Sequence, residues 1–371
     1  MRSPVRADHV GSLLRPRALL AARLHDAASP AELKRLEDEA ILAALARQKA
    51  AGLDIFTDGE FRRAGFMSDF YESVEGLDHG GEVQRAWSGA ASAIGGTSGT
   101  TSGGAVGVVI GKIRQTKSLT SHELDFLREH APGPIKVTLP SANQFPAIAY
   151  KKGISEAAYP TYSSFLWDIV PIIRSEVQRL AAAGVRYIQI DAPRYSYYVD
   201  PKWRHHIQIE MGLDPEAALD EAIRADNACL EGLDRSDVTV AIHLCRGNNR
   251  SQWYAEGGYD PIAGKLFNQL GVDRFLLEYE SERAGTFEPL RFVPREKDVV
   301  LGLVSTKIAA LESKDDLLRR IDEAGRYVPI DRLALSPQCG FASAMEGNLL
   351  TEDDQWRKLD LVVETAREVW G

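Results

Sequence analysis

The chain has 371 residues with a formal net charge of -9, and 44% of its residues are hydrophobic. The negative balance disfavours a nucleic-acid surface, which needs clustered basic residues. No apolar run is long enough to cross a membrane and the N-terminal residues lack a signal-peptide core, so we expect a cytoplasmic protein with no membrane or nucleic-acid partner. Three scattered cysteines are too few for a disulfide framework.

The N-terminal part predicts two strands separated by a helix. Residues 7–13 form the first expected strand, which breaks at Gly11 and Ser12. Ser29 before Pro30 is a helix N-cap pattern, and Gly52 is the expected end of that helix. Residues 53–60 form the second expected strand, which ends in the acidic Glu60.

The segment 78–118 does not continue this pattern of strands and helices, because it is rich in glycine, serine and threonine and low in apolar residues. We predict an inserted loop or hairpin arm between the second and third strands, with residues 106–113 as its returning strand.

From residue 121 onward, helices and apolar strands alternate. The third to eighth strands are expected at residues 135–141, 185–191, 240–245, 275–278, 299–304 and 333–339. Eight strands alternating with helices, without a linker-like break, predict a single α/β domain over residues 1–371, a (β/α)8 TIM barrel.

Metal-binding residue types stand at the ends of three predicted strands. His243 and Cys245 are two residues apart, so they point to the same side of a strand. Glu278 and Cys339 end two later strands, and in a barrel all these ends meet at one mouth. One nitrogen, two sulfurs and one carboxylate suit Zn²⁺, so we predict these four residues as its ligands. Cys229 falls within a helical apolar pattern and is expected in the core.

These residues resemble the cobalamin-independent methionine synthase family, as a stand-alone form of its C-terminal catalytic barrel. The resemblance is carried by Val10-Gly11-Ser12, Asp58-Gly59-Glu60, Ile188-Gln189-Ile190-Asp191, His243-x-Cys245, Glu278 and Pro337-x-Cys339-Gly340. It implies zinc at the last three motifs and homocysteine at the first three. Ser12 and the backbone near Val10 would hold the substrate carboxylate, while Glu60 and Asp191 would hold its ammonium group.

The chain departs from the family pattern on the side of the methyl donor. Ala192 stands where the family has a glutamate, and residues 141–146 lack the tryptophan against which the family stacks its folate. The donor therefore stays open between methyl-folate and a corrinoid protein.

The resulting hypothesis is a zinc-dependent methyltransferase of methionine biosynthesis, which methylates the thiol of homocysteine to give methionine. We expect His243 and Glu278 to be the catalytic residues. Of the metal ligands, Glu278 is the one that would move to make room for the substrate sulfur at the zinc. One alternative is alkylation of another thiol, such as coenzyme M. Another is a non-catalytic barrel in which the zinc is structural and the glycine-rich arm serves a partner. For Glu60 and Asp191 themselves, the structural alternative is helix capping or salt bridging at strand-to-helix turns.

Two further features have both a structural and a functional interpretation. His9 is either a core histidine or part of the site. Residues 246–250 directly follow the first two expected ligands, and they are either a substrate-binding loop or a solvated one.

Overall fold

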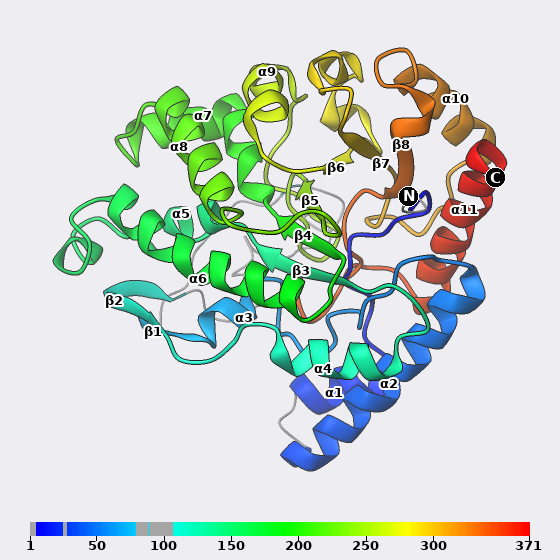
Figure 1. Cartoon of the computed structure of the whole chain (residues 1–371), viewed down its shortest axis with the longest axis horizontal. Helices are drawn as coiled ribbons and strands as arrows, with labels where there is room; N and C mark the ends of the chain where they lie inside the picture. Colours follow the sequence, from blue (N-terminus) through cyan, green and yellow to red (C-terminus); the bar gives the residue numbers. More distant parts are fainter. Residues whose placement is uncertain (1–4, 25–27, 79–87, 89–106) are drawn as a thin grey trace.

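A parallel sheet of six strands, in the order β3-β4-β5-β6-β7-β8, forms the centre of the molecule. The computed structural model describes residues 5–24, 28–78, 88 and 107–371 (Figure 1). The six strands are β3 (Lys136–Pro140), β4 (Tyr187–Asp191), β5 (Thr239–Leu244), β6 (Arg274–Glu278), β7 (Asp298–Val304) and β8 (Leu333–Pro337). Each agrees with a strand predicted from its apolar run.

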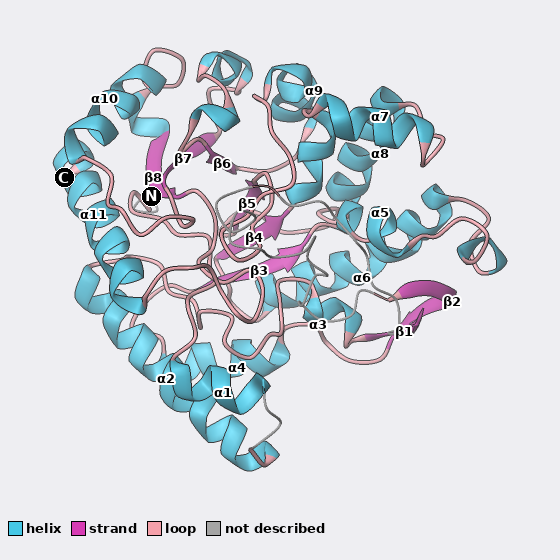
Figure 2. Ribbon diagram, turned by 180° about the vertical axis from the view of Figure 1, so that it is seen from behind, coloured by secondary structure: helices cyan, strands magenta, loops and turns pink. Residues whose placement is uncertain are grey.

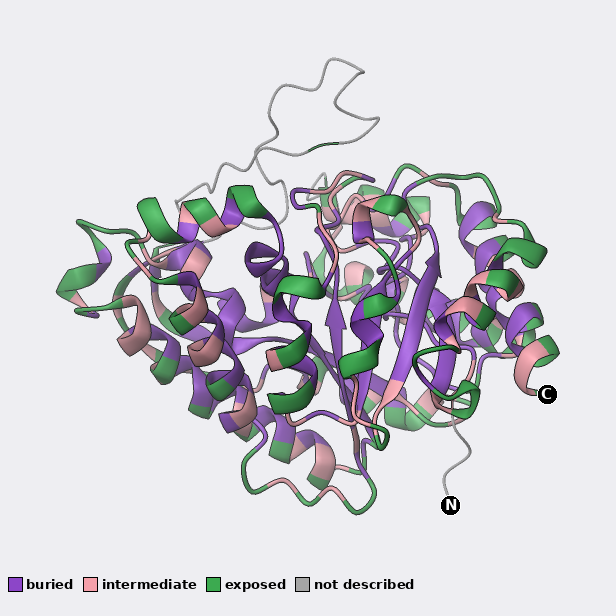
Figure 3. Ribbon diagram, turned by 90° about the horizontal axis from the view of Figure 1, so that it is seen from above, coloured by how far each residue is buried: buried purple, intermediate pink, exposed green. Residues whose placement is uncertain are grey.

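These strands are buried almost throughout (Figure 3). Continuous apolar runs are what a parallel sheet covered on both faces requires. The register places Pro140 beside Asp191, and Asp191 beside His243. An acid and an imidazole predicted from separate parts of the sequence therefore lie next to each other at one end of the sheet.

Helices surround the sheet (Figure 2). They are α1 (Arg17–Leu24), α2 (Pro30–Ala51), α3 (Ser68–Tyr71), α4 (Ser121–His130), α5 (Pro146–Ala149), α6 (Tyr162–Ala182), α7 (Pro201–Ile209), α8 (Pro215–Ala228), α9 (Asp260–Gln269), α10 (Lys314–Ala324) and α11 (Glu352–Trp370). The predicted caps of α2 are confirmed: Ser29 Oγ accepts from Glu32 N at 3.3 Å, and Gly52 ends the helix with a φ of +91°.

Short 3₁₀ turns follow several strands and complete the loops at their ends. They are η2 (Ala142–Gln144), η3 (Ser155–Ala157), η4 (Pro193–Tyr198), η5 (Glu282–Ala284), η6 (Glu288–Phe292) and η7 (Ile330–Arg332).

The first two predicted strands are reduced to single bridges, which corrects the expectation of eight regular strands. Ala7 bridges to Leu335 of β8, and Phe56 bridges to Ile135 next to β3, both in parallel orientation. Side chains take the carbonyls that a ladder would use: Val10 O accepts from the Gln189 amide at 2.7 Å, and Gly11 O accepts from the Thr57 hydroxyl at 2.8 Å. Within the described residues no ladder joins the two segments, so the structure does not establish a closed barrel.

The two segments nevertheless share an interior with the sheet. A small apolar cluster, separate from the main core, takes one side chain from each segment and from five strands of the sheet. Its members are Val10, Ile55, Tyr187, Ala241, Leu276, Val300 and Ala334. Inward-pointing side chains from successive strands are the packing of an α/β barrel interior.

A second, two-stranded antiparallel sheet lies to one side of the parallel sheet (Figure 1). It pairs β1 (Val74–Asp78) with β2 (Val108–Gln115). Strand β2 falls within the predicted arm, 78–118, and overlaps the returning strand expected at 106–113, while residues 79–87 and 89–106 of the arm lie outside the described part. None of the described helices is both long and apolar enough to span a bilayer.

Candidate active site

A cavity opens at the carboxyl ends of the strands. Seven of the eight predicted site residues line it: Val10, Ser12, Glu60, Asp191, His243, Cys245 and Cys339. The remaining lining residues are Phe66, Gln144, Pro193, Gly247, Asn248, Tyr254 and Ser343. The structure therefore brings together residues that are more than 300 positions apart in the chain.

Three of the predicted metal ligands form a compact group. One donor atom each from His243, Cys245 and Cys339 lies within 4.8 Å of the other two. His243 Nε2 is 3.4 Å from Cys339 Sγ, and all three residues are buried. The three residues converge because the carboxyl ends of parallel strands meet at one edge of the sheet: His243 lies at the end of β5, Cys245 directly follows β5, and Cys339 follows β8. One nitrogen and two sulfurs at this spacing fit a borderline cation such as Zn²⁺.

The two thiols of this group are electrostatically unequal. A hydrogen bond from the Cys245 thiol lowers the pKa of Cys339 well below its usual value, and the nearby His243 acts in the same direction. The same hydrogen bond and burial raise the pKa of Cys245. Burial by itself lowers the pKa of His243, but Cys339 outweighs this and raises it. The group is thus arranged around a negative sulfur at Cys339.

The structure does not bring Glu278, the fourth predicted ligand, into this group. Its Oε1 accepts from Arg283 Nη2 at 2.9 Å, and its Oε2 accepts from the backbone N–H of Arg246 at 2.8 Å. Burial alone would raise the pKa of Glu278, but Arg283, Lys307 and Arg246 lower it. Glu278 is therefore an ionised carboxylate held mainly by the following turn.

Ser12 is held at the cavity wall by close backbone packing. Its hydroxyl accepts from Ala342 N at 3.3 Å, which leaves the hydroxyl proton free to donate to a ligand. A Cβ on Gly340 would lie 2.0 Å from Ser12 Oγ, so only glycine fits after Cys339. Gly11 has a φ of +141°, and a Cβ there would lie 3.0 Å from Glu60 Oε1. The two glycines thus let Ser12, Glu60 and Cys339 approach one another.

Glu60 and Asp191 are buried carboxyls that share the cavity. The Thr138 hydroxyl donates to Glu60 Oε1 at 3.0 Å, and the Gln189 amide donates to Asp191 Oδ1 at 2.8 Å. Burial raises the pKa of Glu60, and it raises that of Asp191 to about 7 although His243 opposes the shift. Glu60 has a φ of +59°, a strained conformation for a residue with a side chain. Such a pair favours a cationic partner in the cavity.

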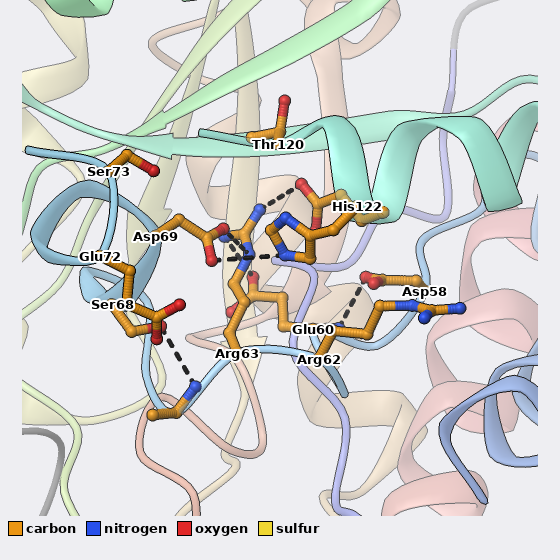
Figure 4. A network of polar contacts seen from close by, with 12 residues as sticks. Asp58, Glu60, Arg62, Arg63, Ser68, Asp69, Glu72, Ser73, Thr120 and His122 are labelled. Carbon is orange, nitrogen blue, oxygen red and sulfur yellow. Dashed lines mark hydrogen bonds and ion pairs between the residues drawn. The ribbon is translucent and has the colours of Figure 1, made fainter. Parts of the chain in front are cut away.

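Arg63 lies beside Glu60 and contacts it directly and through Thr138 (Figure 4). Its Nη1 donates to the Thr138 hydroxyl at 2.8 Å and lies 4.0 Å from Glu60 Oε1. The same guanidinium pairs with Asp69 through Nε at 2.7 Å and with Glu123 through Nη2 at 2.5 Å. One cation is therefore shared among several buried carboxyls, and Glu60 is the member that faces the cavity.

Asp69, His122 and Glu123 are a second group of potential ligand atoms within 4.8 Å of one another. Arg63 already occupies both carboxylates, while His122 Nε2 lies 3.4 Å from Asp69 Oδ1 at the more exposed edge (Figure 4). Burial lowers the pKa of His122 to about 4. We interpret this group as an ion-pair network that supports Glu60.

The structure bears on the two interpretations left open, those of His9 and of the loop 246–250, and on the predicted core position of Cys229. His9 is buried with its Nε2 at 3.2 Å from Ile55 O, and it does not line the cavity. Arg246 is a structural residue, since it donates to Gly257 O and stacks on Tyr259, whereas its neighbours Gly247 and Asn248 line the cavity. Cys229 belongs to the core, as predicted.

Several lining residues were not found by sequence reasoning. Gln144 and Pro193 follow the third and fourth strands, a position that marks cavity residues in an α/β fold. Asn248, by contrast, lies in the loop 246–250 that the sequence analysis singled out; Lys307 Nζ donates to its Oδ1 at 3.0 Å, and its own amide donates to Gly340 O at 2.8 Å. Phe66, Tyr254 and Ser343 come from loops and carried no local signal.

Comparisons with known proteins show which family this chain resembles. The family model described as "Cobalamin-independent synthase, Catalytic domain" matches residues 14–367. The Bacillus subtilis protein YxjH is 38% identical over 380 residues, which span 100% of this chain and 96% of that protein. The methionine synthase of Pyrococcus abyssi is 25% identical over 369 residues, or 97% of this chain and 91% of that enzyme.

A solved structure shares the fold. It is a B12-independent methionine synthase from Shewanella, solved in complex with selenomethionine, with a TM-score of 0.75 and 22% identity. The match covers 99% of this chain and 98% of that one. The likeness therefore extends over the whole α/β architecture.

Proposed function

The chain belongs to the family of cobalamin-independent synthase catalytic domains, and we propose that it is a zinc-dependent methyltransferase that converts homocysteine to methionine. The observation that carries the proposal is the single cavity in which the His243, Cys245 and Cys339 group meets Ser12, Glu60 and Asp191. Soft metal ligands beside paired acids match a substrate with a thiol at one end and an ammonium group at the other.

His243, Cys245 and Cys339 would hold the metal, with Glu278 as the fourth ligand. A carboxylate oxygen can accept a hydrogen bond and still offer a lone pair, so the bonds of Glu278 to Arg283 and Arg246 are compatible with this role. When bound there, zinc would stabilise the substrate thiol as a thiolate, the nucleophilic form of sulfur. His243 and Glu278 would then tune this centre, because one supplies its nitrogen and the other its exchangeable oxygen.

The acid residues would orient the amino-acid end of the substrate. Glu60 and Asp191 would balance its ammonium group, because burial raises the pKa values of both carboxyls more than Arg63 and His243 lower them. The free proton of the Ser12 hydroxyl and the backbone near Val10 would hold its carboxylate. Positioning of this kind supplies much of the rate of a displacement reaction, because it replaces an encounter in solution.

We also propose the closed form of the fold. The shared interior cluster supports eight segments arranged as a (β/α)8 barrel over residues 1–371, with residues 78–118 as an insertion between the second and third segments. The cavity would then be the barrel mouth, where active sites of this architecture lie.

The experiment is a methyl-transfer assay on zinc-loaded protein with homocysteine as acceptor. Methyl-tetrahydropteroyl triglutamate and a methylated corrinoid are offered separately as donors, and methionine is measured. Methionine formation with either donor supports the proposal and identifies the donor. A protein that binds zinc but methylates homocysteine with neither donor overturns it. Activity on coenzyme M or another thiol without an amine would change the substrate and remove the role of Glu60 and Asp191.

A further inference from the structure

Gln189 lies beneath the cavity and bonds to two residues of its wall. It stands between Tyr187 and Asp191 on β4, and the three side chains point to the same side of the strand because strand side chains alternate. The amide Nε2 of Gln189 donates to Asp191 Oδ1 at 2.8 Å and to Val10 O at 2.7 Å. Both partners line the cavity, whereas Gln189 is fully buried and does not. It therefore connects two parts of the wall from behind.

The orientation of the Gln189 amide is fixed by a cation on the neighbouring strand. Lys136 Nζ, on β3, donates to Gln189 Oε1 at 3.0 Å and to Asp8 Oδ1 at 2.5 Å. An ammonium group only donates hydrogen bonds, so it must face the oxygen of the amide, and the NH₂ group must point away from it. Val10 O only accepts, so it imposes the same orientation from the other end. The amide therefore cannot turn over without losing both bonds.

Lys136 is in turn held by the N-terminal segment. It also donates to His9 O, and the Tyr187 hydroxyl donates to Asp8 Oδ2 at 2.5 Å. Burial alone would raise the pKa of Asp8, but Lys136 and Arg274 outweigh it and lower the pKa to about 2. Asp8 is therefore ionised and pairs with a charged Lys136. Side chains of β3 and β4 thus fix the segment that leads into the cavity.

The two bonds donated by Gln189 set the separation of two unlike parts of the cavity. Asp191 supplies a carboxyl group, whereas Val10 supplies backbone. A trans peptide holds its C=O and N–H antiparallel, and no described peptide bond is cis, so the bond to Val10 O also fixes the N–H of Gly11. Under the proposed function, Asp191 would hold the ammonium group of the substrate, and the backbone near Val10 its carboxylate. In an α-amino acid these two groups are attached to one carbon, so their separation is fixed.

We propose that Gln189 is a specificity-determining positioning residue, which holds Asp191 and Val10 at the separation that suits a thiol with an ammonium and a carboxylate group on one carbon. The inference rests on the proposed function, which assigns these two groups to the two parts of the wall. Gln189 acts through its two partners and does not touch the substrate. Lys136 supports it by fixing the amide.

The test compares the dissociation constants of three thiols for the zinc-loaded protein, measured by calorimetry. They are homocysteine, 3-aminopropanethiol, which lacks the carboxylate, and 4-mercaptobutyrate, which lacks the amine. In Gln189→Met we expect homocysteine to bind roughly tenfold more weakly, and the two truncated thiols to change by less than about threefold. A single charged group can follow its partner when that partner moves, whereas two groups on one carbon need both partners at a fixed separation.

Gln189→Glu is a second variant that keeps the size of the side chain and a bond to Lys136. It has no N–H to donate to Asp191 or Val10 O, so the preference for homocysteine should fall at least as much as in Gln189→Met. This variant carries the same test if Gln189→Met does not fold. Wild-type preference in Gln189→Glu would overturn the proposal.

Gln48 on α2 offers a matched control. It is as fully buried as Gln189 and also makes two comparable bonds: its Nε2 donates to Thr57 O at 2.9 Å, and its Oε1 accepts from Thr57 N at 3.0 Å. Gln48 does not line the cavity. Gln48→Met should lower the Tm and keep the wild-type preference among the three thiols. The same result for Gln189→Met, a lower Tm with an unchanged preference, would show a merely structural role and overturn the proposal.

The wild-type measurement separates this inference from the proposed function. If the wild type binds homocysteine no more tightly than either truncated thiol, the amino-acid substrate is wrong and the inference falls with it. If the wild type prefers homocysteine and the Gln189 variants keep that preference, only the role of Gln189 fails.

Discussion

The cavity has two sides that differ in what surrounds them. The sulfur side consists of His243, Cys245 and Cys339, and the acid side consists of Ser12, Glu60 and Asp191. On the acid side, bonds from the Thr138 hydroxyl and the Gln189 amide fix the carboxyls. On the sulfur side, the donor atoms mainly contact one another, and His243 Nδ1 has no partner among the described residues.

Under the proposed function, this difference would let one cavity bind two unlike cationic groups, which are the ammonium group of the substrate and the metal ion. The acid side is prearranged for a hydrogen-bonding cation such as an ammonium group, because its supporting shell is complete. The sulfur side lacks such a shell, and under the proposed function a metal that binds soft donors would complete it. Changes on one side should therefore leave binding on the other largely intact.

The largest effect is expected from Cys339→Ser. The change removes the thiol with the lowered pKa, and we expect zinc content to fall far below one ion per chain and kcat/KM to fall roughly 10²–10³-fold. Zinc is measured by metal analysis after dialysis. Cys229→Ser, a change of a core cysteine remote from the cavity, is the control and should retain zinc. Full zinc and activity in Cys339→Ser would refute the sulfur side as a metal site.

A smaller effect is expected from Glu60→Gln, which tests the independence of the two sides. The KM for homocysteine should rise roughly 30-fold, or about 2 kcal/mol, because the ammonium group loses a buried countercharge. Zinc content should not change. The matched comparison is a thiol without an amine, for which Glu60→Gln and the wild type should differ little. An equal loss for both thiols would contradict the ammonium role.

Glu278→Gln tests whether the carboxylate serves the metal as well as Arg283. We expect zinc affinity to fall roughly tenfold, as measured by competition with a chelator, because an amide oxygen is a weaker ligand. The free energy of unfolding should also fall by about 2 kcal/mol, since Arg283 loses one of its two buried carboxylate partners and keeps Glu280. Unchanged zinc affinity together with this loss of stability would assign Glu278 to Arg283 alone.

The smallest effect is a pH dependence on the acid side. Asp191 has a pKa raised to about 7 by burial, so it is protonated below that pH and cannot balance an ammonium group. We expect kcat/KM for homocysteine to rise with pH up to about 7, by no more than tenfold per pH unit. In Asp191→Asn this rise should be lost or moved to lower pH. A profile identical in wild type and variant would exclude Asp191 as its cause.

Much of the site could be predicted from the sequence because period-two alternation places His243 and Cys245 on one face, and apolar runs locate the strand ends. The fork of Arg63 could not, since its partners Asp69, Glu123 and Thr138 come from three separate segments. The orientation of Glu278 could not either, because Arg283 on the next turn competes for it. The first two predicted strands are single bridges instead, because side chains take carbonyls that a longer ladder would use, among them those of Val10 and Gly11.

The central claim is that the sulfur side binds zinc in order to activate a substrate thiol. Zinc X-ray absorption on the metal-loaded protein, recorded with and without homocysteine, tests it most directly. We predict two sulfur neighbours without the substrate, from Cys245 and Cys339, and three in its presence. A sulfur count that stays at two when homocysteine is saturating would contradict thiol activation and favour a structural metal.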